Sequence, residues 1–319
     1  MKLCAFGELL IDVAPYGLSD RNFPIYEFNP GGAPANVAVA VANLGYQSSF
    51  IGQVGNDHFG NFLKNVLLEK KVDTEGLLMS SKYPTSLAIV SIGNNGERSF
   101  SFYRKNNADV MVEMNDTFKH KIDEADIFHI GSVSMTDEPG RTTSFKLLKY
   151  AKSKHKIISY DPNLRRLLWD NLDEARKVIL KGLLYADIVK VSEEELVFLT
   201  GINEYESACK WLSENYPFKL LFVTFGSDGC AIYFKQRYTH IASFKVNAID
   251  TTGAGDGFFG GVLAQLMQRE LRLDSLTERE LYHISVYANA CGAFATTRKG
   301  AIGSLAYPDD IKQLGGENR

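Results

Sequence analysis

Apolar runs of strand length alternate with helical patterns along most of the chain. Six runs predict strands, at 3–13, 49–54, 125–130, 156–160, 187–191 and 220–225. Helical spacing separates most of them, and one helical face is marked by Phe59, Phe62, Leu63, Val66 and Leu67. The small residues of 35–44 predict a further helix, with Pro34 suited to its first turn. This alternation predicts a three-layer α/β/α fold with a mostly parallel central sheet, and binding sites beyond the carboxyl ends of its strands.

Two segments interrupt the alternation. The runs 86–92 and 99–103 flank Gly93-Asn94-Asn95-Gly96, which is typical of a β-hairpin turn, and residues 15–30 follow no clear period. We expect the two pieces to form a small antiparallel β sheet that acts as a lid, made of about 14–30 and 84–108. The chain, 1–319, is then one domain with an inserted lid. A hairpin at the sheet edge without a lid function remains the alternative.

Composition and charge exclude several classes of protein. The chain of 319 residues has 45% hydrophobic and 23% charged residues and a net charge of -3, which is ordinary for a globular protein. No long basic run indicates a nucleic-acid surface, and no uncharged apolar stretch is long enough for a membrane span. Glu8 and Asp12 come too early for a signal peptide, and four widely spaced cysteines form no C-x-x-C. We therefore expect a cytoplasmic protein.

The strongest chemical signal is the segment Asp250-Thr251-Thr252-Gly253-Ala254-Gly255-Asp256. A strand-like run at 244–249 precedes it, and an apolar helix follows. Small residues at 253–255 let consecutive amides converge at a helix N-terminus, which attracts anions. A carboxylate there repels a bound phosphate unless it accepts a proton from an attacking hydroxyl, which gives Asp256 a role as general base. The alternative is that Asp256 only complements the helix dipole.

The same region contains Gly255-x-Gly257-x-x-Gly260, which formally matches a dinucleotide-binding fingerprint. Its place near the end of the chain and the carboxylate of Asp256 argue against a pyrophosphate there. No βαβ unit follows to supply an acid for the ribose. Since no glycine is followed by lysine, a Walker A loop is also absent, and any ATP must be bound in another way.

Three further loops carry candidate polar contacts. Gly31-Gly32-Ala33-Pro34-Ala35-Asn36 opens a helix, and with Asp12 it offers the mixed donors and acceptors that a polyol needs, or else forms a plain tight turn. Ser192 and Glu195 form a capping-box pattern whose carboxylate could instead organise Mg²⁺ through water. Residues 224–229 follow an apolar run and favour close approach of a nucleotide.

Together these segments resemble the ribokinase-like (PfkB) carbohydrate kinases, and within them the fructokinases. Residues 31–38 and 250–256 carry the resemblance as two separated motifs in the family's order. Between them the chain is similar to fructokinases at Phe102-Tyr103-Arg104, 159–165, 190–195 and 198–201. The family's N-x-x-E motif reads Ser192-x-x-Glu195 here, and fructokinases have a similar serine. The resemblance covers nearly the whole chain.

The resemblance implies a ribokinase-like fold and ATP-dependent phosphorylation of the 6-hydroxyl of D-fructose. It implies Asp256 as catalytic base, with the anion hole formed by Gly253, Ala254, Gly255 and Asp256. Sugar contacts are implied for Asp12, Gly31, Gly32, Asn36, Arg104 and Arg165. Nucleotide contacts are implied for Lys190, Ser192, Glu195, Thr224, Gly226, Gly229 and Asn289.

The resemblance also implies ions and an assembly. Glu195 would hold Mg²⁺ through water. A monovalent cation, K⁺, would be held, largely by backbone oxygens, at Asp250, Thr252, Ala295, Arg298, Gly300 and Ser304. The family further implies a homodimer formed through the lid, which the apolar Phe100 and Phe102 favour because exposed apolar surface seeks cover.

Other functions remain open on the sequence alone. Arg104 and Arg165 could bind the carboxylate of 2-keto-3-deoxygluconate, and ribose or a nucleoside could also be the acceptor. The glycine fingerprint at 255–260 leaves a nicotinamide-dependent oxidoreductase as an alternative of another class. A non-catalytic sugar-binding regulator is the third, although it would have no need of Asp256.

Overall fold

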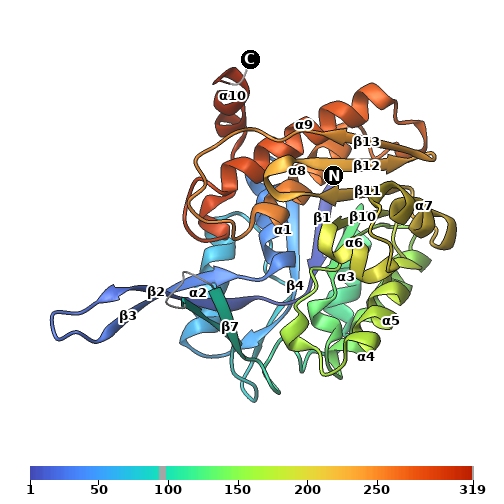
Figure 1. Ribbon diagram of the computed structural model, residues 1–319. Coiled ribbons are helices and arrows are strands. Elements are labelled where there is room, and N and C mark those ends of the chain that lie inside the picture. The colour runs from blue at the N-terminus through green and yellow to red at the C-terminus, as the bar shows by residue number, and fades with distance from the viewer. Residues whose placement is uncertain (93–97, 318–319) are drawn as a thin grey trace.

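The computed structural model describes residues 1–92 and 98–317, and its core is a large, mostly parallel sheet (Figure 1). Within these residues the sheet has nine strands in the order β13-β12-β11-β10-β9-β8-β1-β4-β5. Only β12 and β13 run antiparallel to their neighbours. The strands are β1 (Lys2–Phe6), β4 (Gln47–Gly55), β5 (Leu77–Ser80), β8 (Ile127–Gly131), β9 (Ile157–Asp161), β10 (Ile188–Ser192), β11 (Leu220–Thr224), β12 (Cys230–Phe234) and β13 (Arg237–Ile241). The predicted mostly parallel sheet is confirmed.

Helices cover both faces of this sheet, because its strands bury both sets of side chains. Along β1, Leu3 and Ala5 join one apolar core, while Cys4 and Phe6 join the other. The first core is covered by α1 (Ala33–Asn43), α2 (His58–Glu69), α8 (Ala254–Gln268) and α9 (Glu278–Ala295). The second is covered by α3 (Asp116–Glu124), α4 (Gly140–Ser153), α5 (Leu172–Leu183), α6 (Glu193–Thr200) and α7 (Tyr205–Asn215).

Shorter and terminal elements complete the chain. Helix α10 (Pro308–Glu317) packs on α9. The described residues also contain short 3₁₀ turns, namely η1 (Val133–Met135), η2 (Arg166–Leu168), η3 (Gly226–Asp228), η4 (Leu273–Ser275) and η5 (Ile302–Ser304). Across the described ranges, we find no helix with the length and apolar character that a bilayer crossing requires.

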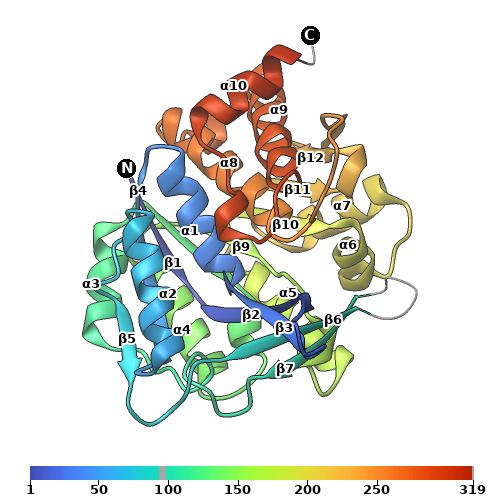
Figure 2. The same cartoon turned by 90° about the vertical axis from the view of Figure 1, so that its left-hand side faces the viewer.

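A second, smaller sheet lies beside the main one and has the order β3-β2-β6-β7, as Figure 2 shows. Its strands are β2 (Leu10–Leu18), β3 (Pro24–Gly31), β6 (Leu87–Ile92) and β7 (Arg98–Tyr103). The expectation of an antiparallel sheet is wrong at one pairing, since β2 and β6 run parallel. Both strands enter this sheet from the main body in the same direction, after β1 and β5 respectively. Of the predicted hairpin turn, residues 93–96 lie outside the described residues.

Two predicted strands differ from the structure. The run 3–13 is divided into β1 and β2 around Gly7, where a Cβ atom would lie 2.5 Å from Pro34 Cγ at the start of α1. The run 244–249 has no regular structure, and Lys245, Ala248 and Ile249 are exposed there. This segment follows β13 without a sheet partner, so its apolar residues alone do not make it a strand.

Candidate active site

A cleft of about 1540 Å³ lies at the carboxyl ends of the central strands. It is lined by Glu8 after β1, Lys190 and Ser192 on β10, and Thr224 on β11. The first turn of α8 and the start of α1 complete its wall. The cleft therefore collects most of the predicted site residues where a parallel sheet binds its ligands.

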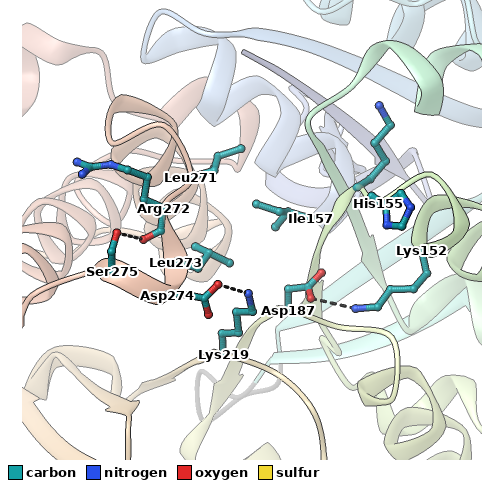
Figure 3. Close-up of a pocket in the computed structure, with 11 residues that line it drawn as sticks. Lys152, His155, Ile157, Asp187, Lys219, Leu271, Arg272, Leu273, Asp274 and Ser275 are labelled. Atoms are coloured by element: carbon teal, nitrogen blue, oxygen red, sulfur yellow. Dashed lines mark hydrogen bonds and ion pairs between the residues drawn. The ribbon is translucent and has the colours of Figure 1, made fainter.

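A second pocket, of about 500 Å³, lies at the amino ends of β9, β10 and β11, and Figure 3 shows the residues that line it. Two of its lysines are paired with acids, since Lys152 Nζ lies 3.0 Å from Asp187 Oδ1 and Lys219 Nζ lies 2.6 Å from Asp274 Oδ2. It contains none of the predicted site residues. We therefore build the candidate active site on the larger cleft.

The first turn of α8 presents unpaired amides to the cleft. Gly253 caps the helix with a φ of 78°, which favours glycine, and its carbonyl accepts from the Gly257 amide at 2.8 Å. The Ala254 amide donates to Thr251 O at 3.2 Å. Within the described chain, the amides of Gly255 and Asp256 have no partner. The anion-binding capacity of this turn therefore rests on these two donors rather than on all of 253–256.

Asp256 faces the cleft beside these amides. Its Oδ2 accepts a hydrogen bond of 2.7 Å from Asn36 Nδ2, and among the described residues Oδ1 has no partner. Burial raises the pKa of the Asp256 carboxyl, while Asn36, Lys190 and Arg165 oppose the rise. One oxygen is thus fixed by Asn36, and the other is available to a ligand hydroxyl.

A buried cation lies against the same turn. Lys190 Nζ is 2.9 Å from Asp161 Oδ2, and both side chains are buried. A Cβ atom at Gly255 would lie 2.9 Å from this ammonium, which shows how closely it approaches the turn. Burial lowers the pKa of Lys190, but the carboxylates of Asp161, Glu195 and Asp256 outweigh this effect and raise it. Lys190 therefore stays protonated and adds a full charge to the amides.

The polyol-binding residues predicted near the N-terminus gather at the end of the cleft formed by β2 and α1. Burial raises the pKa of Asp12 to about 6, with Arg165 acting in the opposite direction. Gly31 contacts Asp12 so closely that a Cβ atom would lie 2.2 Å from Oδ2. Gly32 and Asn36 line the cleft, whereas Gly31 is not among its lining residues.

Arg104 lies elsewhere than the resemblance implies. Its Nε is 2.6 Å from Asp109 Oδ2, and the two side chains are 3% and 1% exposed. The rest of the guanidinium donates to Thr136 Oγ1 at 2.8 Å and to Val133 O at 3.0 Å. Arg104 is not among the residues lining the cleft. It anchors the carboxyl end of β7 to the residues at η1 and does not line the cleft.

Glu8 lines the cleft but was not predicted as a site residue. It is 3% exposed, and its Oε1 accepts from the Ala33 amide at 2.9 Å. Burial raises its pKa to about 7, although Arg104 lowers it. Its position directly after β1 was the only signal in the sequence. Asp161, at the end of β9, was also not predicted as a site residue, although it lies in the segment 159–165 that is similar to fructokinases.

The nucleotide loops predicted at 224–229 lie at the other end of the cleft. Gly226 and Gly229 have φ angles of 54° and 103°, and a Cβ at Gly229 would lie 2.2 Å from Ile241 O. Asn289 lines the cleft, but its Nδ2 donates to Ile241 O and Ala242 O at 3.1 and 3.2 Å. Its amide therefore holds the backbone of this wall.

Ser192 and Glu195 form the capping box that the sequence left as an alternative. Ser192 Oγ accepts from the Glu195 amide, and Glu195 Oε2 accepts from the Ser192 amide at 2.8 Å. Glu195 Oε1 also accepts from the Leu164 amide at 2.6 Å. Both residues still line the cleft, together with Glu193 and Glu194, so capping does not remove them from it.

The segments implied in monovalent cation binding lie side by side. Thr296 O accepts from the Asp250 amide at 3.1 Å, and Asp250 Oδ2 accepts from the Gly300 amide at 3.2 Å. Thr252 Oγ1 donates to Asp250 Oδ1 at 2.7 Å. Of the remaining positions, Ala295 and Ser304 are buried, and the Arg298 side chain lies over Phe294. No group of three His, Cys, Asp or Glu residues able to hold a metal occurs in the described chain.

Comparisons with known proteins agree on one family. The model of the pfkB family carbohydrate kinases matches residues 1–307. Fructokinase-1 of Zea mays is 43% identical over 312 residues, covering 97% of this chain and 96% of the relative. Fructokinase-1 of Oryza sativa subsp. japonica is 42% identical, covering 97% and 95%.

Solved structures show the same fold. A fructokinase from Xylella fastidiosa with bound ATP is 34% identical, with a TM-score of 0.90 and coverage of 99% and 98%. A fructokinase from Vibrio cholerae O395 with fructose, ADP and a calcium ion is 33% identical, with a TM-score of 0.86 and coverage of 98% of each chain. The ribokinase-like fold and the resemblance drawn from the two glycine motifs are confirmed. This chain belongs to the pfkB family of carbohydrate kinases.

Proposed function

We propose that this protein is an ATP-dependent fructokinase that transfers the γ-phosphoryl group of ATP to the 6-hydroxyl of D-fructose. The observation that carries the proposal is Asp256, with one oxygen unpaired, beside two unpaired amides at the N-terminus of α8. The relatives named fructokinase, which are 40–44% identical to this chain, support this sugar. The neighbours solved with ATP, or with fructose and ADP, support both substrates.

Each residue of this site has its own proposed role in the reaction. Asp256 Oδ1 accepts the proton of the attacking hydroxyl, while Asn36 holds Oδ2 and fixes the carboxylate. The amides of Gly255 and Asp256 and the Lys190 ammonium donate to the oxygens of the transferred phosphoryl group, whose charge they stabilise. Asp161 holds Lys190 in place. Thr224, Gly226 and Gly229 leave room for the nucleotide.

The carboxylates at the start of α6 fit Mg²⁺, because they are hard oxygen ligands lining the cleft. Glu195, aided by Glu193 or Glu194, would hold the ion through water, and the ion would supply charge neutralisation of the phosphates. The paired segments around Asp250 and Gly300 offer backbone oxygens of the kind that hold K⁺. One solved structure, of a double mutant of a fructokinase from Vibrio cholerae O395, has fructose, ADP and a potassium ion bound.

The charges at the sugar end of the cleft bear on the choice of acceptor. Glu8, Asp12 and Arg165 line the cleft, whereas Arg104, the other cation that could bind a keto-acid, is paired with Asp109. Two acids beside one available cation favour a neutral sugar over 2-keto-3-deoxygluconate. A neutral riboside stays the second candidate, because an aminoimidazole riboside kinase from Salmonella enterica is 29% identical with a TM-score of 0.83.

The structure gives the glycine fingerprint another purpose. A Cβ atom at Gly260 would lie 2.3 Å from Ala40 Cβ, so this glycine permits the close packing of α1 and α8. A dinucleotide fingerprint directly follows a strand, whereas residues 244–249, which precede this segment, have no regular structure. The nicotinamide-dependent oxidoreductase therefore has no support left, and the unpaired oxygen of Asp256 disfavours a pure sugar-binding regulator.

The small sheet is proposed to act as the lid, and a homodimer to form through it. Ala88 and Phe102 place β6 and β7 on the cleft wall, where closure would exclude water. Figure 1 shows β2 and β3 extending away from the body of the molecule. Their exposed apolar side chains support the dimer, namely Tyr16, Leu18, Phe23, Ile25, Tyr26 and Phe28. The side chain of Phe100 lies outside the described residues, and Phe102 faces the cleft.

A cytoplasmic location is proposed on the state of the cysteines. Cys4, Cys209, Cys230 and Cys291 are all free and buried, which fits a reducing compartment. One relative, probable fructokinase-6 of Arabidopsis thaliana, is named chloroplastic.

The proposal is tested by a phosphorylation screen and one variant. Wild-type protein with ATP and Mg²⁺ is offered fructose, ribose, 2-keto-3-deoxygluconate and nucleosides, and the position of the new phosphate is determined by NMR. Asp256→Asn should lower kcat by about 10²–10⁴-fold while fructose still binds. Asp116→Asn is the matched control, because Asp116 is also an acid in the first turn of a helix but is exposed and remote from the cleft. Near-normal turnover of Asp256→Asn would remove the proposed base.

A further inference from the structure

Glu8 is a buried acid to which the proposed reaction assigns no role. It lies between β1 and β2, lines the sugar end of the cleft, and accepts from the Ala33 amide through Oε1. Its Oε2 is buried and has no partner within the described chain. A buried carboxyl oxygen without a partner is costly, so its presence calls for a reason.

The N-terminus of α1 lacks the usual stabilising groups of its own. Gly32 occupies the N-cap with a φ of 118° and has no side chain to accept from the first turn, and that turn carries no acid. Glu8 supplies both functions from another part of the chain, since its carboxylate binds the Ala33 amide at the positive end of the helix. A side chain at Gly32 could not take over, because its Cβ would lie 2.3 Å from Glu8 O.

The first turn of α1 connects Glu8 with the catalytic base. The Asn36 amide donates to Gly32 O at 2.9 Å, which closes the turn that Glu8 holds. From the same turn, Asn36 Nδ2 donates to Asp256 Oδ2 at 2.7 Å. The position of Asn36 on the cleft wall and its hydrogen bond to Asp256 thus depend on the position of Ala33.

We propose that Glu8 is a positioning residue for the sugar: by holding the Ala33 amide it fixes the first turn of α1, and with it Gly32 and Asn36. The inference rests on the proposed function, because it gives the cleft a sugar substrate. Glu8 acts through the turn and transfers no proton.

Three variants and a control separate this role from a general loss of structure. Glu8→Ala and Glu8→Asp both withdraw the acceptor from Ala33, and should raise the KM for fructose by about 10–100-fold while the KM for ATP stays within about twofold. Glu8→Gln keeps an acceptor oxygen and should stay within about threefold of wild type. Glu204→Ala is the matched control, since Glu204 caps α7 at the surface and should change neither KM.

A double-mutant cycle tests the route through Asn36. Glu8→Asp combined with Asn36→Ala should be no worse than Asn36→Ala alone in KM for fructose. Additive effects would overturn the proposal, as would a wild-type KM for fructose in folded Glu8→Asp, or equal increases in the KM for ATP. If Glu8→Ala does not fold, Glu8→Asp and Glu8→Gln decide the question. If the wild-type protein phosphorylates a different sugar, the proposed substrate is wrong, and the same comparison with that sugar still tests Glu8.

Discussion

Replacing Arg104 with methionine distinguishes an anchor of the fold from a ligand of the sugar. The resemblance to fructokinases implies that Arg104 faces the sugar, whereas the structure buries it with Asp109 at the foot of β7. Methionine preserves much of the volume and removes the charge. The change therefore reports on the ion pair and its hydrogen bonds more than on packing.

The expected loss of stability follows from the hydrogen-bond partners that remain for the Asp109 carboxylate. After the substitution, the only partner that its buried carboxylate keeps among the described residues is the hydroxyl of Ser86, while Thr136 Oγ1 and Val133 O each lose the hydrogen bond from Arg104. Removing one partner of a buried pair costs about 3–5 kcal/mol, because the other charge stays buried without compensation. Urea unfolding followed by circular dichroism should show a decrease of this size. Arg104→Met/Asp109→Leu should recover part of it, since no charge is then left unpaired.

The control and the kinetics complete this test. Arg237 pairs with Glu278 at the surface, where both side chains are 71% exposed, so Arg237→Met should cost at most about 1 kcal/mol. At a temperature where Arg104→Met is folded, its KM for fructose should stay within about threefold of wild type. A variant of wild-type stability whose KM for fructose rises more than about tenfold would show that Arg104 contacts the sugar and that the argument from burial is wrong.

Three further predictions concern the cleft. Gly255→Ala should lower kcat by about 10²–10³-fold in a steady-state assay, because the new Cβ would displace the Lys190 ammonium. Its thermal unfolding temperature should change little, since alanine favours the helix. An unchanged kcat would exclude Lys190 from the phosphoryl site. Asp12→Asn should stabilise the ligand-free protein at about pH 7.5 but not at about pH 4. Burial raises the pKa of Asp12 from 3.8 to about 6, so the cost of its ionised form builds up between these two values and is complete above about pH 6. A difference in urea midpoint between variant and wild type that is the same at both pH values would contradict this. Fructose should slow hydrogen exchange in 86–92 and 98–103; no change there would leave the small sheet without a lid function.

The fold was largely predictable because its signals are local. The helical period at 59–67 and the small residues of 35–44 predict α2 and α1, and buried parallel strands read as plain apolar runs. The wrong predictions concern strands, because a segment forms a strand, and pairs parallel or antiparallel, according to a neighbouring strand that is distant in sequence. The run 244–249 has apolar residues but no neighbouring strand, and β2 pairs in parallel with β6, which lies more than 70 residues later in the chain. No local pattern encodes such a pairing.

The candidate site was predictable to the extent that its chemistry belongs to one short segment. The proposed anion site consists of amides in the first turn of α8 itself, so the sequence 250–256 was enough to indicate it. Arg104 could not be placed from the sequence. Only the fold reveals that its guanidinium is already paired with Asp109, Thr136 and Val133. Glu8 lies in no recognised motif. Its hydrogen-bond partner Ala33 is 25 residues away, so no local pattern indicates their contact.

The packing of α1 against α8 explains why two distant glycine motifs form one site. Each helix begins at a glycine N-cap, and each first turn carries one member of the Asn36–Asp256 pair. Gly260 brings the helices together, since any larger residue would meet Ala40. The hydrogen bond between Asn36 and Asp256 can form only at this separation, because both side chains are short. The glycine that resembled part of a dinucleotide fingerprint therefore sets the distance between the proposed sugar-binding turn and the proposed catalytic base.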